Sequence, residues 1–306
     1  MAAVAAELHR GVNLGGVFDR RDQRPGWRVL ARHFDDLATA GFRSVRLPVR
    51  WWGHSVDRSP FTLDKQFLRR VTDLVDAVSD RGLSVVLTMH HADGVYEDPG
   101  QAGPRLVSLW EQISQQFADH SAPLAFELLN EPRAALTPSA WNALLPAVMV
   151  AVRDADPDRL LVIGGAEAST LAGLRQLELP PDDHLVATLH YYEPFPFTHQ
   201  GASWEPGSEA WMGTGWGASA EFADVTADLE EAARWASQRG LVLYVGEFGT
   251  IGVADPGSRI RWTRHVRREM ERLRLPWAYW DFATDFGLYD LEQSRWRSSL
   301  RDAVLG

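Results

Sequence analysis

The chain has no cysteine among its 306 residues, and it has no uncharged apolar run near the roughly 18 residues that suggest a membrane helix. Disulfides, thiolate nucleophiles and cysteine-ligated zinc sites are therefore excluded. Its formal net charge of -10 also lacks the basic excess with which nucleic-acid binders neutralise phosphates. These absences favour a protein that acts on a neutral, polar molecule, with neither nucleic acid nor a membrane as its partner.

The first ten residues lack the features of a secretory signal. They contain no basic n-region, and Glu7 and His9 interrupt a short apolar run. We therefore expect either a cytoplasmic protein or a secreted one whose signal precedes this sequence. The residues do not separate these two alternatives.

The composition is that of a folded globular protein, with 45% hydrophobic and 24% charged residues. The length suits one large α/β domain or two small ones. Because no linker, low-complexity segment or repeat divides the chain, we predict a single catalytic domain over residues 1–306. The 13 tryptophans are unusual. We expect most of them in the core and the rest in a groove, where indole rings stack on sugar faces.

Eight short apolar segments alternate with amphipathic stretches. Most of the apolar segments are continuous Val, Leu, Ile and Phe runs, which are typical of parallel strands buried on both faces. The stretches between them have helical periodicity, as in Phe67, Val71 and Leu74. The predicted strands are Gly11–Gly15, Ser44–Pro48, Ser84–His90, Leu124–Leu129, Leu160–Ile163, Leu185–Tyr191, Leu241–Glu247 and Trp277–Phe282.

This alternation predicts an α/β fold, specifically a single (β/α)8 TIM barrel, and the count of eight strands favours it over a doubly wound open sheet. Two long stretches, Ala92–Pro104 and Glu193–Ser219, are predicted to be loops. The second is rich in aromatic residues. It either packs them as a small core of its own or contributes one or two to a binding cleft.

Polar residues follow the predicted strands at their carboxyl ends, which is the catalytic face of such barrels. In chain order they are Arg46, His90, His91, Asn130, Glu131, His190, Tyr191, Tyr192, Glu193, Glu247, Trp280 and Asp281. Burying a carboxylate costs several kcal/mol unless it is paired or hydrogen-bonded. Either glutamate alone could be a structural partner of Arg46 or of a histidine. Glu131 and Glu247 together, beside the other polar residues, favour a catalytic pair.

Two carboxyl groups across a pocket are what glycosidic cleavage requires. One donates a proton to the leaving oxygen, while the other attacks the anomeric carbon or activates water. Their separation decides the outcome, because about 5–5.5 Å gives retention and about 6.5–9.5 Å gives inversion of configuration. The sequence does not supply that distance.

These residues resemble glycoside hydrolase family 5, the large family that contains many cellulases, over nearly the whole chain. The motifs that carry the resemblance are Arg10–Gly16, Arg46 with Pro48 and Trp51, Met89–Ala92, Asn130–Pro132, His190 with Tyr192, Gly246–Gly249, and Trp280. The Asn-Glu-Pro tripeptide alone is a weak signal. Together with the later Glu-Phe-Gly, each ending a predicted strand in the order of the barrel, it is a specific one.

The resemblance implies a retaining hydrolase in which Glu131 is the acid/base and Glu247 the nucleophile. Arg46 and Tyr192 would hold Glu247 ionised, and Asn130 would bind the 2-hydroxyl of the sugar. Three further residues complete the implied site: His90 and His190, which would bind sugar hydroxyls or orient the carboxylates, and Trp280, which would be the stacking floor.

Structural alternatives remain for individual residues. Arg46 could be a plain ion-pair partner, and His90 and His190 could be satisfied core histidines. We interpret His91 as structural. Trp51 and Trp52 are expected to point to opposite sides, and neither Asp281 nor Glu193 receives a role.

The chemistry requires Glu131 to keep its proton while Glu247 is ionised. We expect burial and the nearby charge of Glu247 to raise the pKa of Glu131. We expect no metal and no organic cofactor, because the histidines are not spaced as a metal-binding set.

Within the family, residues 190–204 most resemble those of bacterial endo-1,4-β-glucanases. We therefore expect a monomer that cleaves internal bonds of β-1,4-glucan or a related polysaccharide or oligosaccharide. A β-mannanase, a 1,3-β-glucanase or another β-glycosidase is the main alternative, since a few hydroxyl contacts decide specificity. Two remoter alternatives are a non-catalytic carbohydrate-binding barrel and a barrel enzyme for a phosphorylated substrate. The latter would want a glycine-rich phosphate cradle after the last two strands.

Overall fold

The structure is a computed structural model that describes residues 7–21, 28–120 and 123–306. The first six residues, on which the expectation about a signal partly rests, lie outside the described residues. The prediction of one domain over residues 1–306 extends to them as well.

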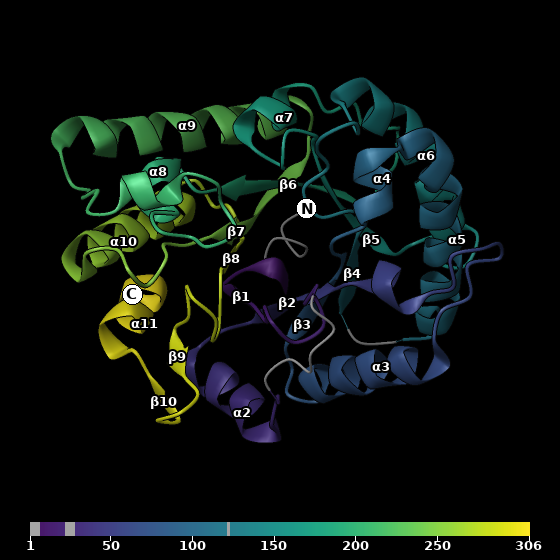
Figure 1. The fold of residues 1–306 in the computed structure, drawn as a ribbon, viewed down its shortest axis with the longest axis horizontal. Helices are drawn as coiled ribbons and strands as arrows, with labels where there is room; N and C mark the ends of the chain where they lie inside the picture. The colour runs from purple at the N-terminus through teal and green to yellow at the C-terminus, as the bar shows by residue number, and fades with distance from the viewer. Residues whose placement is uncertain (1–6, 22–27, 121–122) are drawn as a thin grey trace.

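The described residues contain a closed barrel of eight parallel strands (Figure 1). The strands are β1 (Gly11–Asn13), β2 (Ser44–Val49), β3 (Ser84–Met89), β4 (Leu124–Glu127), β5 (Leu160–Gly164), β6 (Leu185–Tyr191), β7 (Val242–Phe248) and β8 (Trp277–Tyr279). Each strand pairs with the next, and Gly11 of β1 pairs with both Ser44 of β2 and Ala278 of β8, which closes the ring. This closure confirms the (β/α)8 prediction over an open sheet.

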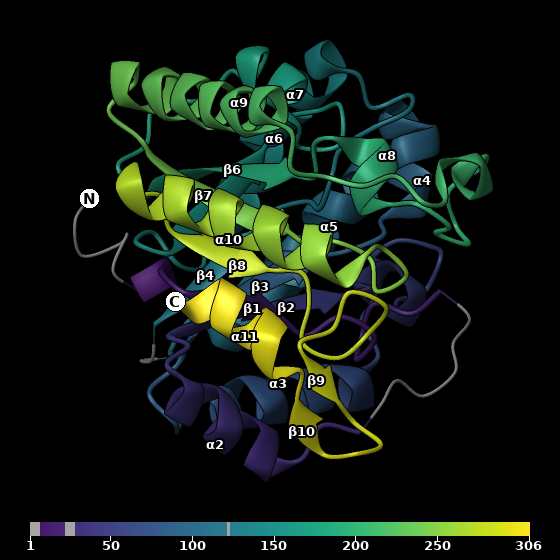
Figure 2. The same cartoon turned by 90° about the vertical axis from the view of Figure 1, so that its left-hand side faces the viewer.

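Helices surround the barrel on its outside, as the two perpendicular views show (Figures 1 and 2). They are α2 (Ala31–Ala40), α3 (Lys65–Ser79), α4 (Asp93–Glu97), α5 (Pro99–Phe117), α6 (Pro138–Arg153), α7 (Leu171–Arg175), α8 (Phe195–Thr198), α9 (Ser219–Gln238), α10 (Pro256–Arg272) and α11 (Ser298–Leu305). Two 3-10 turns, η1 (Trp51–His54) and η2 (Ser208–Trp211), and a hairpin of β9 (Tyr289–Asp290) and β10 (Arg295–Trp296) complete the described elements.

Side-chain caps explain where several helices begin. The carboxylate of Asp64 accepts hydrogen bonds from two backbone N–H groups of α3, and Thr137 and Asp255 each cap the helix that follows them. The apolar stripe of α3 faces the barrel, with Phe67 and Val71 buried. Helix periodicity in the sequence therefore identified the face that packs against the strands.

Three strands end two or three residues earlier than predicted. β1, β4 and β8 were expected to reach Gly15, Leu129 and Phe282, but the chain leaves the sheet sooner. Leu128 and Phe282 nevertheless stay buried, and each donates a backbone hydrogen bond to an adjacent strand. The apolar run therefore continues past the strand, because these residues pack at the mouth of the barrel.

The prediction of a loop over Ala92–Pro104 was wrong. This stretch forms α4 and the first turns of α5. Asp98 caps α5 by accepting from the N–H of Gln101 at 3.0 Å, and Pro99 occupies the first turn, where no backbone N–H is required. Glycine and proline suggested a loop here, whereas they stand at a helix start.

For Glu193–Ser219 we considered two alternatives: its aromatic residues pack as a small core, or one or two of them line a binding cleft. The stretch contains buried and exposed aromatic residues. Phe197 and Trp216 are buried, which is the small-core alternative. Trp204 is 54% exposed, so it remains available to a ligand. Apart from α8 and η2, the stretch has no regular structure.

The core has two layers. The larger one lies between the strands and the helices. A smaller cluster fills the barrel interior and includes Val86, Val162, Val186 and Tyr244. Within the described ranges, seven tryptophans are buried, namely Trp51, Trp110, Trp141, Trp216, Trp235, Trp262 and Trp277. No helix in the described parts of the chain is long and apolar enough to cross a membrane.

The close approach of α7 to the loop after β5 gives a stability prediction. A Cβ atom on Gly173 would overlap the backbone carbonyl of Ala166, which cannot move as a side-chain tip could. We expect Gly173→Ala to lower the free energy of unfolding by about 3 kcal/mol, as overpacking does, measured by urea denaturation.

Gly100→Ala is the matched control. The new Cβ would meet only the Asp98 carboxylate, at an ordinary 3.5 Å, in the first turn of α5. This variant should unfold at the wild-type urea concentration or slightly above it. Equal midpoints for the two variants would contradict the packing described for α7.

Candidate active site

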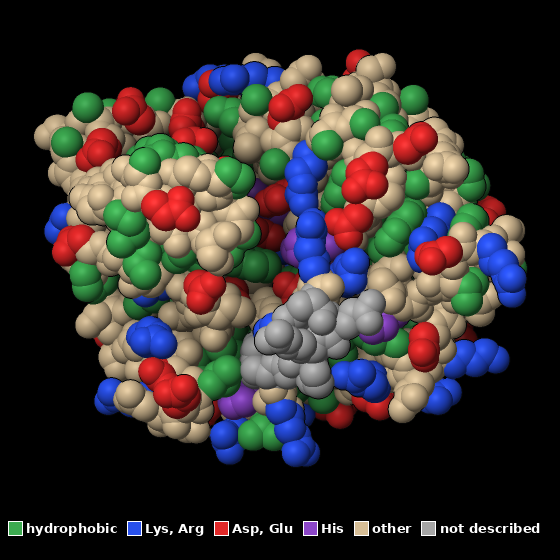
Figure 3. All heavy atoms as spheres, in the orientation of Figure 1, with side chains coloured by type: hydrophobic (Ala, Val, Ile, Leu, Met, Phe, Trp, Pro, Cys, Tyr) green, Lys and Arg blue, Asp and Glu red, His purple; other side chains and the backbone are tan. Residues whose placement is uncertain are grey.

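A hollow opens at the centre of the face shown in Figure 3, with acidic and histidine side chains in it and Lys or Arg side chains along one edge. The predicted site residues come from the carboxyl ends of different strands, as the barrel fold requires. Arg46, His190 and Glu247 belong to β2, β6 and β7, whereas Glu131 and Trp280 follow β4 and β8. Residues far apart in the sequence thus meet at one end of the barrel.

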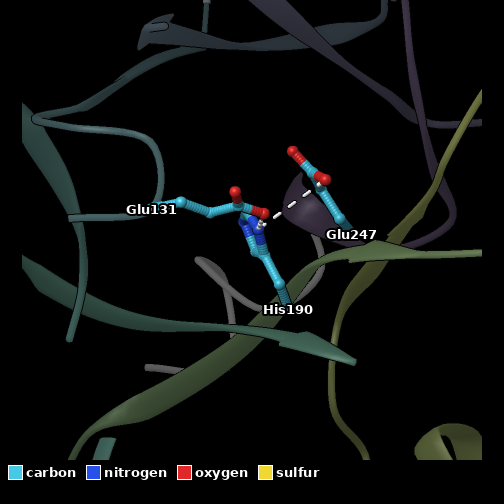
Figure 4. A group of neighbouring side chains, drawn as sticks. All are labelled: Glu131, His190 and Glu247. Carbon is cyan, nitrogen blue, oxygen red and sulfur yellow. Dashed lines mark hydrogen bonds and ion pairs between the residues drawn. The ribbon is translucent and has the colours of Figure 1, made fainter. Parts of the chain in front are cut away.

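The two predicted catalytic glutamates face each other across a short gap (Figure 4). One ligand atom from each of Glu131, His190 and Glu247 lies within 4.8 Å of the other two. The Nδ1 atom of His190 lies 3.0 Å from Oε1 of Glu131 and 3.7 Å from Oε2 of Glu247. An approach this close between oxygens of the two glutamates is compatible with the carboxyl separation of about 5–5.5 Å in retaining glycosidases.

Arg46 is completely buried, and its guanidinium donates hydrogen bonds to four residues of the site. Its Nη1 donates to Oε1 of Glu247 at 2.5 Å and to Oδ1 of Asn13 at 2.8 Å. Its Nη2 donates to Oδ1 of Asn130 at 2.8 Å. The rest of the guanidinium binds Glu127, with Nε–Oε2 and Nη2–Oε1 distances of 2.6 Å. The position of Glu247 is therefore fixed by a cation that also binds a second carboxylate.

Tyr192 provides the second hydrogen bond to Glu247. Its hydroxyl donates to Oε2 at 2.8 Å, while Arg46 binds Oε1, so both carboxylate oxygens are engaged. Asn130 is fixed with its carbonyl oxygen toward Arg46. Arg46 and Tyr192 thus both contact Glu247. The binding of the sugar 2-hydroxyl by Asn130 stays a prediction.

The sequence interpretation missed three residues of this site. Glu127 and Asn13 are fully buried polar residues inside apolar strands, and the cost of burying them was a signal that could have found both. Arg133 lies two residues after Glu131, and its Nη1 donates to the Glu131 carboxylate at 3.1 Å. Nothing in the sequence orients that side chain, which is held over the Tyr96 ring at 4.7 Å.

The protonation of the glutamates is opposite to the direction expected from the sequence. Burial disfavours the charged form of Glu131, but the hydrogen bond and charge of His190, followed by the charges of Arg133 and Arg46, lower its pKa to about 2. Burial raises the pKa of Glu247, although His190 and Arg46 oppose the shift. Glu131 is therefore ionised in the free site, because cations that the sequence did not place beside it contact it.

His190 is positioned to carry the proton that the free site holds. Burial opposes its charged form, yet the charge of Glu247 and the hydrogen bond to Glu131 outweigh burial and raise its pKa. His190 thus stands between the two glutamates as their common hydrogen-bonding partner. A role as a passive core histidine does not explain these contacts.

His90 and Trp280 form one wall of the site. Their rings are parallel, with an interplanar angle of 6° and centroids 6.0 Å apart. Burial lowers the pKa of His90 well below its usual value, so this imidazole is neutral. Trp280 is only half-buried. Its ring can therefore receive the apolar face of a sugar.

The neighbouring candidates make other contacts. His91 packs edge-on against His90 at 4.3 Å and lies 3.5 Å from Arg21, as a residue of the rim. Asp281 is buried and accepts a hydrogen bond from the N–H of Thr284 at 3.1 Å, and burial raises its pKa to about 8. Glu193 is exposed. None of these contacts involves Glu131 or Glu247.

The two adjacent tryptophans after β2 differ in burial. Trp51 is fully buried in the core, whereas Trp52 is half-buried and lies under the guanidinium of Arg105 at 4.2 Å. Both residues lie in η1 and not on a strand, so the alternation of side chains along a strand, on which the expectation of opposite sides rested, does not apply to them.

Glu131, His190 and Glu247 also form a group that could hold a metal ion in the described part of the chain. However, Arg46 and Arg133 already place positive charge within 3.1 Å of the two carboxylates. A divalent cation would be repelled by both guanidinium groups. We therefore interpret the group as one that exchanges protons.

Known proteins are similar to the chain in both sequence and structure. Endoglucanase H of Acetivibrio thermocellus is 30% identical over 297 residues, which cover 96% of this chain but 32% of that protein. The chain thus spans about a third of that relative. Thermotoga maritima Cel5A has a TM-score of 0.95 and 35% identity in its cellobiose complex, with 98% of each chain covered. Its mannotriose complex gives a TM-score of 0.94 at 35% identity, covering 97% of each chain.

The sequence profile described as "Cellulase (glycosyl hydrolase family 5)" matches residues 24–285. This match spans most of the chain and includes both glutamates and the residues that hold them. The protein therefore belongs to the cellulase family, glycosyl hydrolase family 5.

Proposed function

We propose that the protein is a retaining endo-β-1,4-glucanase, with Glu247 as the nucleophile and Glu131 as the acid/base. The observation that carries the proposal is the approach of the two glutamates to within 4.8 Å at the mouth of a closed barrel. Arg46 and Tyr192 favour the ionised form of Glu247 through their hydrogen bonds. No metal or organic cofactor is required for this chemistry.

In the first step, a carboxylate oxygen of Glu247 attacks the anomeric carbon and the glycosidic C–O bond breaks. The electron pair of that bond passes to the leaving oxygen, which takes a proton from Glu131. Trp280 supports the sugar from below, and Asn130 meets its 2-hydroxyl. In the second step, water attacks the glycosyl-enzyme while Glu131 accepts the proton, which releases the sugar and restores Glu247.

His190 accounts for how Glu131 acquires its proton. In the free site the proton is favoured on His190, 3.0 Å from Glu131. A bound sugar excludes water from around Glu131, which disfavours its charged form and draws the proton across that hydrogen bond. When Glu247 becomes an ester, His190 loses the charge that contributes most to raising its pKa, and the contact with Glu131 remains. Glu131, which has given its proton to the leaving oxygen, is then the base for water.

The substrate proposal rests on the open side of the site. Tyr192 packs against His199 at 4.8 Å, and both His199 and the exposed Trp204 approach Phe286, at 5.4 and 6.3 Å. Trp204 thus gives a stacking surface connected to the site through packed rings, as an extended glycan chain requires. Two similar structures contain cellobiose and mannotriose bound to Thermotoga maritima Cel5A. A β-1,4-mannan is therefore the second candidate substrate.

Initial rates on three polysaccharides test the specificity. We expect the highest rate on carboxymethyl cellulose, a lower rate on β-mannan and none on laminarin, because the first two share equatorial β-1,4 linkages. Endo-cleavage should lower the viscosity of carboxymethyl cellulose long before many reducing ends appear. Glu247→Gln is the control for contaminating activity. A wild-type protein inactive on carboxymethyl cellulose would refute the glucanase proposal.

The pH profile of kcat/KM tests the contact between Arg133 and Glu131. Arg133 helps to lower the pKa of Glu131, so Arg133→Met should let Glu131 hold its proton to higher pH. The basic limb of the profile, which reports loss of the acid's proton, should move up by roughly one pH unit.

Arg21→Met is the matched control. It removes an arginine of the rim that pairs with Asp93 at 2.9 Å and does not contact either glutamate in the described structure. Its basic limb should stay at the wild-type position. If both variants move the limb equally, the effect belongs to the overall charge of the rim and the assigned contact is wrong.

A further inference from the structure

Glu127 is a buried carboxylate at the bottom of the site that the acid/base chemistry does not use directly. It lies in β4 with no exposed surface, four residues before Glu131. Its two oxygens accept from Nε and Nη2 of Arg46, both at 2.6 Å, in a bidentate ion pair. Thr88 donates a third hydrogen bond, of 3.2 Å, to Oε2. Both carboxylate oxygens of Glu127 therefore accept hydrogen bonds from Arg46.

The bidentate pair determines which donors of Arg46 remain for the reaction. A guanidinium is planar and has five N–H donors in fixed directions. Glu127 accepts from one edge of that plane, and the opposite side, Nη1, then points at Glu247. A single carboxylate contact would allow the plane to turn, whereas two parallel contacts do not. Glu127 therefore fixes the direction of the hydrogen bond that Glu247 receives.

Glu127 also changes the charge balance around the nucleophile. Arg46 is a full positive charge without contact with water, and it touches Glu127 and Glu247 at once. With Glu127 ionised, the pair of Arg46 and Glu127 is neutral overall. Glu131, His190 and Glu247 then face no net positive charge from below, and the negative charge of the two glutamates can retain a proton. Without Glu127, the charge of Arg46 would favour loss of that proton.

We propose that Glu127 is a positioning residue for the hydrolysis, one that aims Arg46 at the nucleophile and cancels its charge so that the site keeps its catalytic proton. This proposal rests on the proposed roles of Glu131 and Glu247. It adds a requirement that those roles alone do not contain, namely a third carboxylate that touches neither the sugar nor the reacting atoms.

Several other ionisable groups face this network from the surrounding strands, and their charges enter the same balance. They are Asp19 after β1, His90 after β3, Glu131 and Arg133 after β4, His190 and Tyr192 in and after β6, and Tyr244 and Glu247 in β7. Among these described groups, Arg46 is the cation in direct contact with Glu127. Removing the Glu127 charge therefore acts first on Arg46 and through it on Glu247.

Two substitutions separate orientation from charge. Glu127→Gln keeps the size but removes the negative charge and offers an NH2 group where Arg46 needs an acceptor. We expect kcat/KM to fall about 100-fold, the loss that a misplacement of roughly 1 Å can cause. Both limbs of the pH profile should also move to lower pH, by roughly one unit. Glu127→Asp keeps the charge but shortens the reach, so kcat/KM should fall while both limbs stay near the wild-type pH.

Tyr244→Phe is the matched control for a change inside the barrel. Tyr244 is fully buried near Arg46, and its hydroxyl has no hydrogen-bond partner in the described residues. Its removal alters neither charge nor a contact of Arg46, so activity and both limbs should remain as in the wild type. Circular dichroism and thermal melts of all variants verify that each protein is folded.

A titration of the His190 imidazole by 15N NMR gives a readout that does not require activity. In Glu127→Gln the pKa of His190 should fall relative to the wild type, because Arg46 is no longer neutralised. In Glu127→Asp and Tyr244→Phe it should stay at the wild-type value. An unchanged His190 titration and unmoved pH limbs in folded Glu127→Gln would overturn the proposal. A wild-type protein without β-glycan hydrolysis would instead overturn the proposed function, whatever the titration shows.

Discussion

The structure of the site depends on one buried guanidinium. Arg46 has no contact with solvent, and its donors bind Asn13, Glu127, Asn130 and Glu247, which come from three other strands or their ends. An uncompensated charge at this depth would cost several kcal/mol, so its carboxylate partners are obligatory. The barrel supplies the rigid ring of strands that holds these partners in place. Removing Arg46 would leave Glu127 without the cation that it binds and Glu247 with His190 alone, at 3.7 Å.

Three glutamates belong to the network of hydrogen bonds and ion pairs around Arg46. They have the same side chain, but each has different hydrogen-bonding partners. Glu127 is bound entirely by donors, Glu247 by Arg46 and Tyr192, and Glu131 by His190 and by Arg133 at the open edge. Such differences in environment assign acid, base and nucleophile roles to identical side chains. His190 lies between Glu131 and Glu247, and its contacts with both raise its pKa.

The fold could be predicted from the sequence because parallel strands that are buried on both faces appear as continuous apolar runs. β6 runs over Leu185–Tyr191 as predicted, and the predicted catalytic glutamates lie at the barrel mouth. The prediction of a loop over Ala92–Pro104 was wrong because glycine and proline are frequent both in loops and at helix starts. The predicted direction of the pKa shift of Glu131 was wrong for a different reason. It depends on where the side chains of Arg133 and His190 point, and a linear pattern does not contain that information.

The central claim is that Glu247 forms a covalent bond to the sugar while Glu131 transfers protons. The most direct measurement uses a cellobioside with fluorine at carbon 2 and a good leaving group, followed by mass spectrometry of the proteolysed protein. Fluorine slows both steps, and the leaving group restores the first, so the intermediate accumulates. Our account predicts one label per chain, on the peptide that contains Glu247. A label on Glu131, or turnover of cellulose by a protein that never becomes labelled, would contradict it.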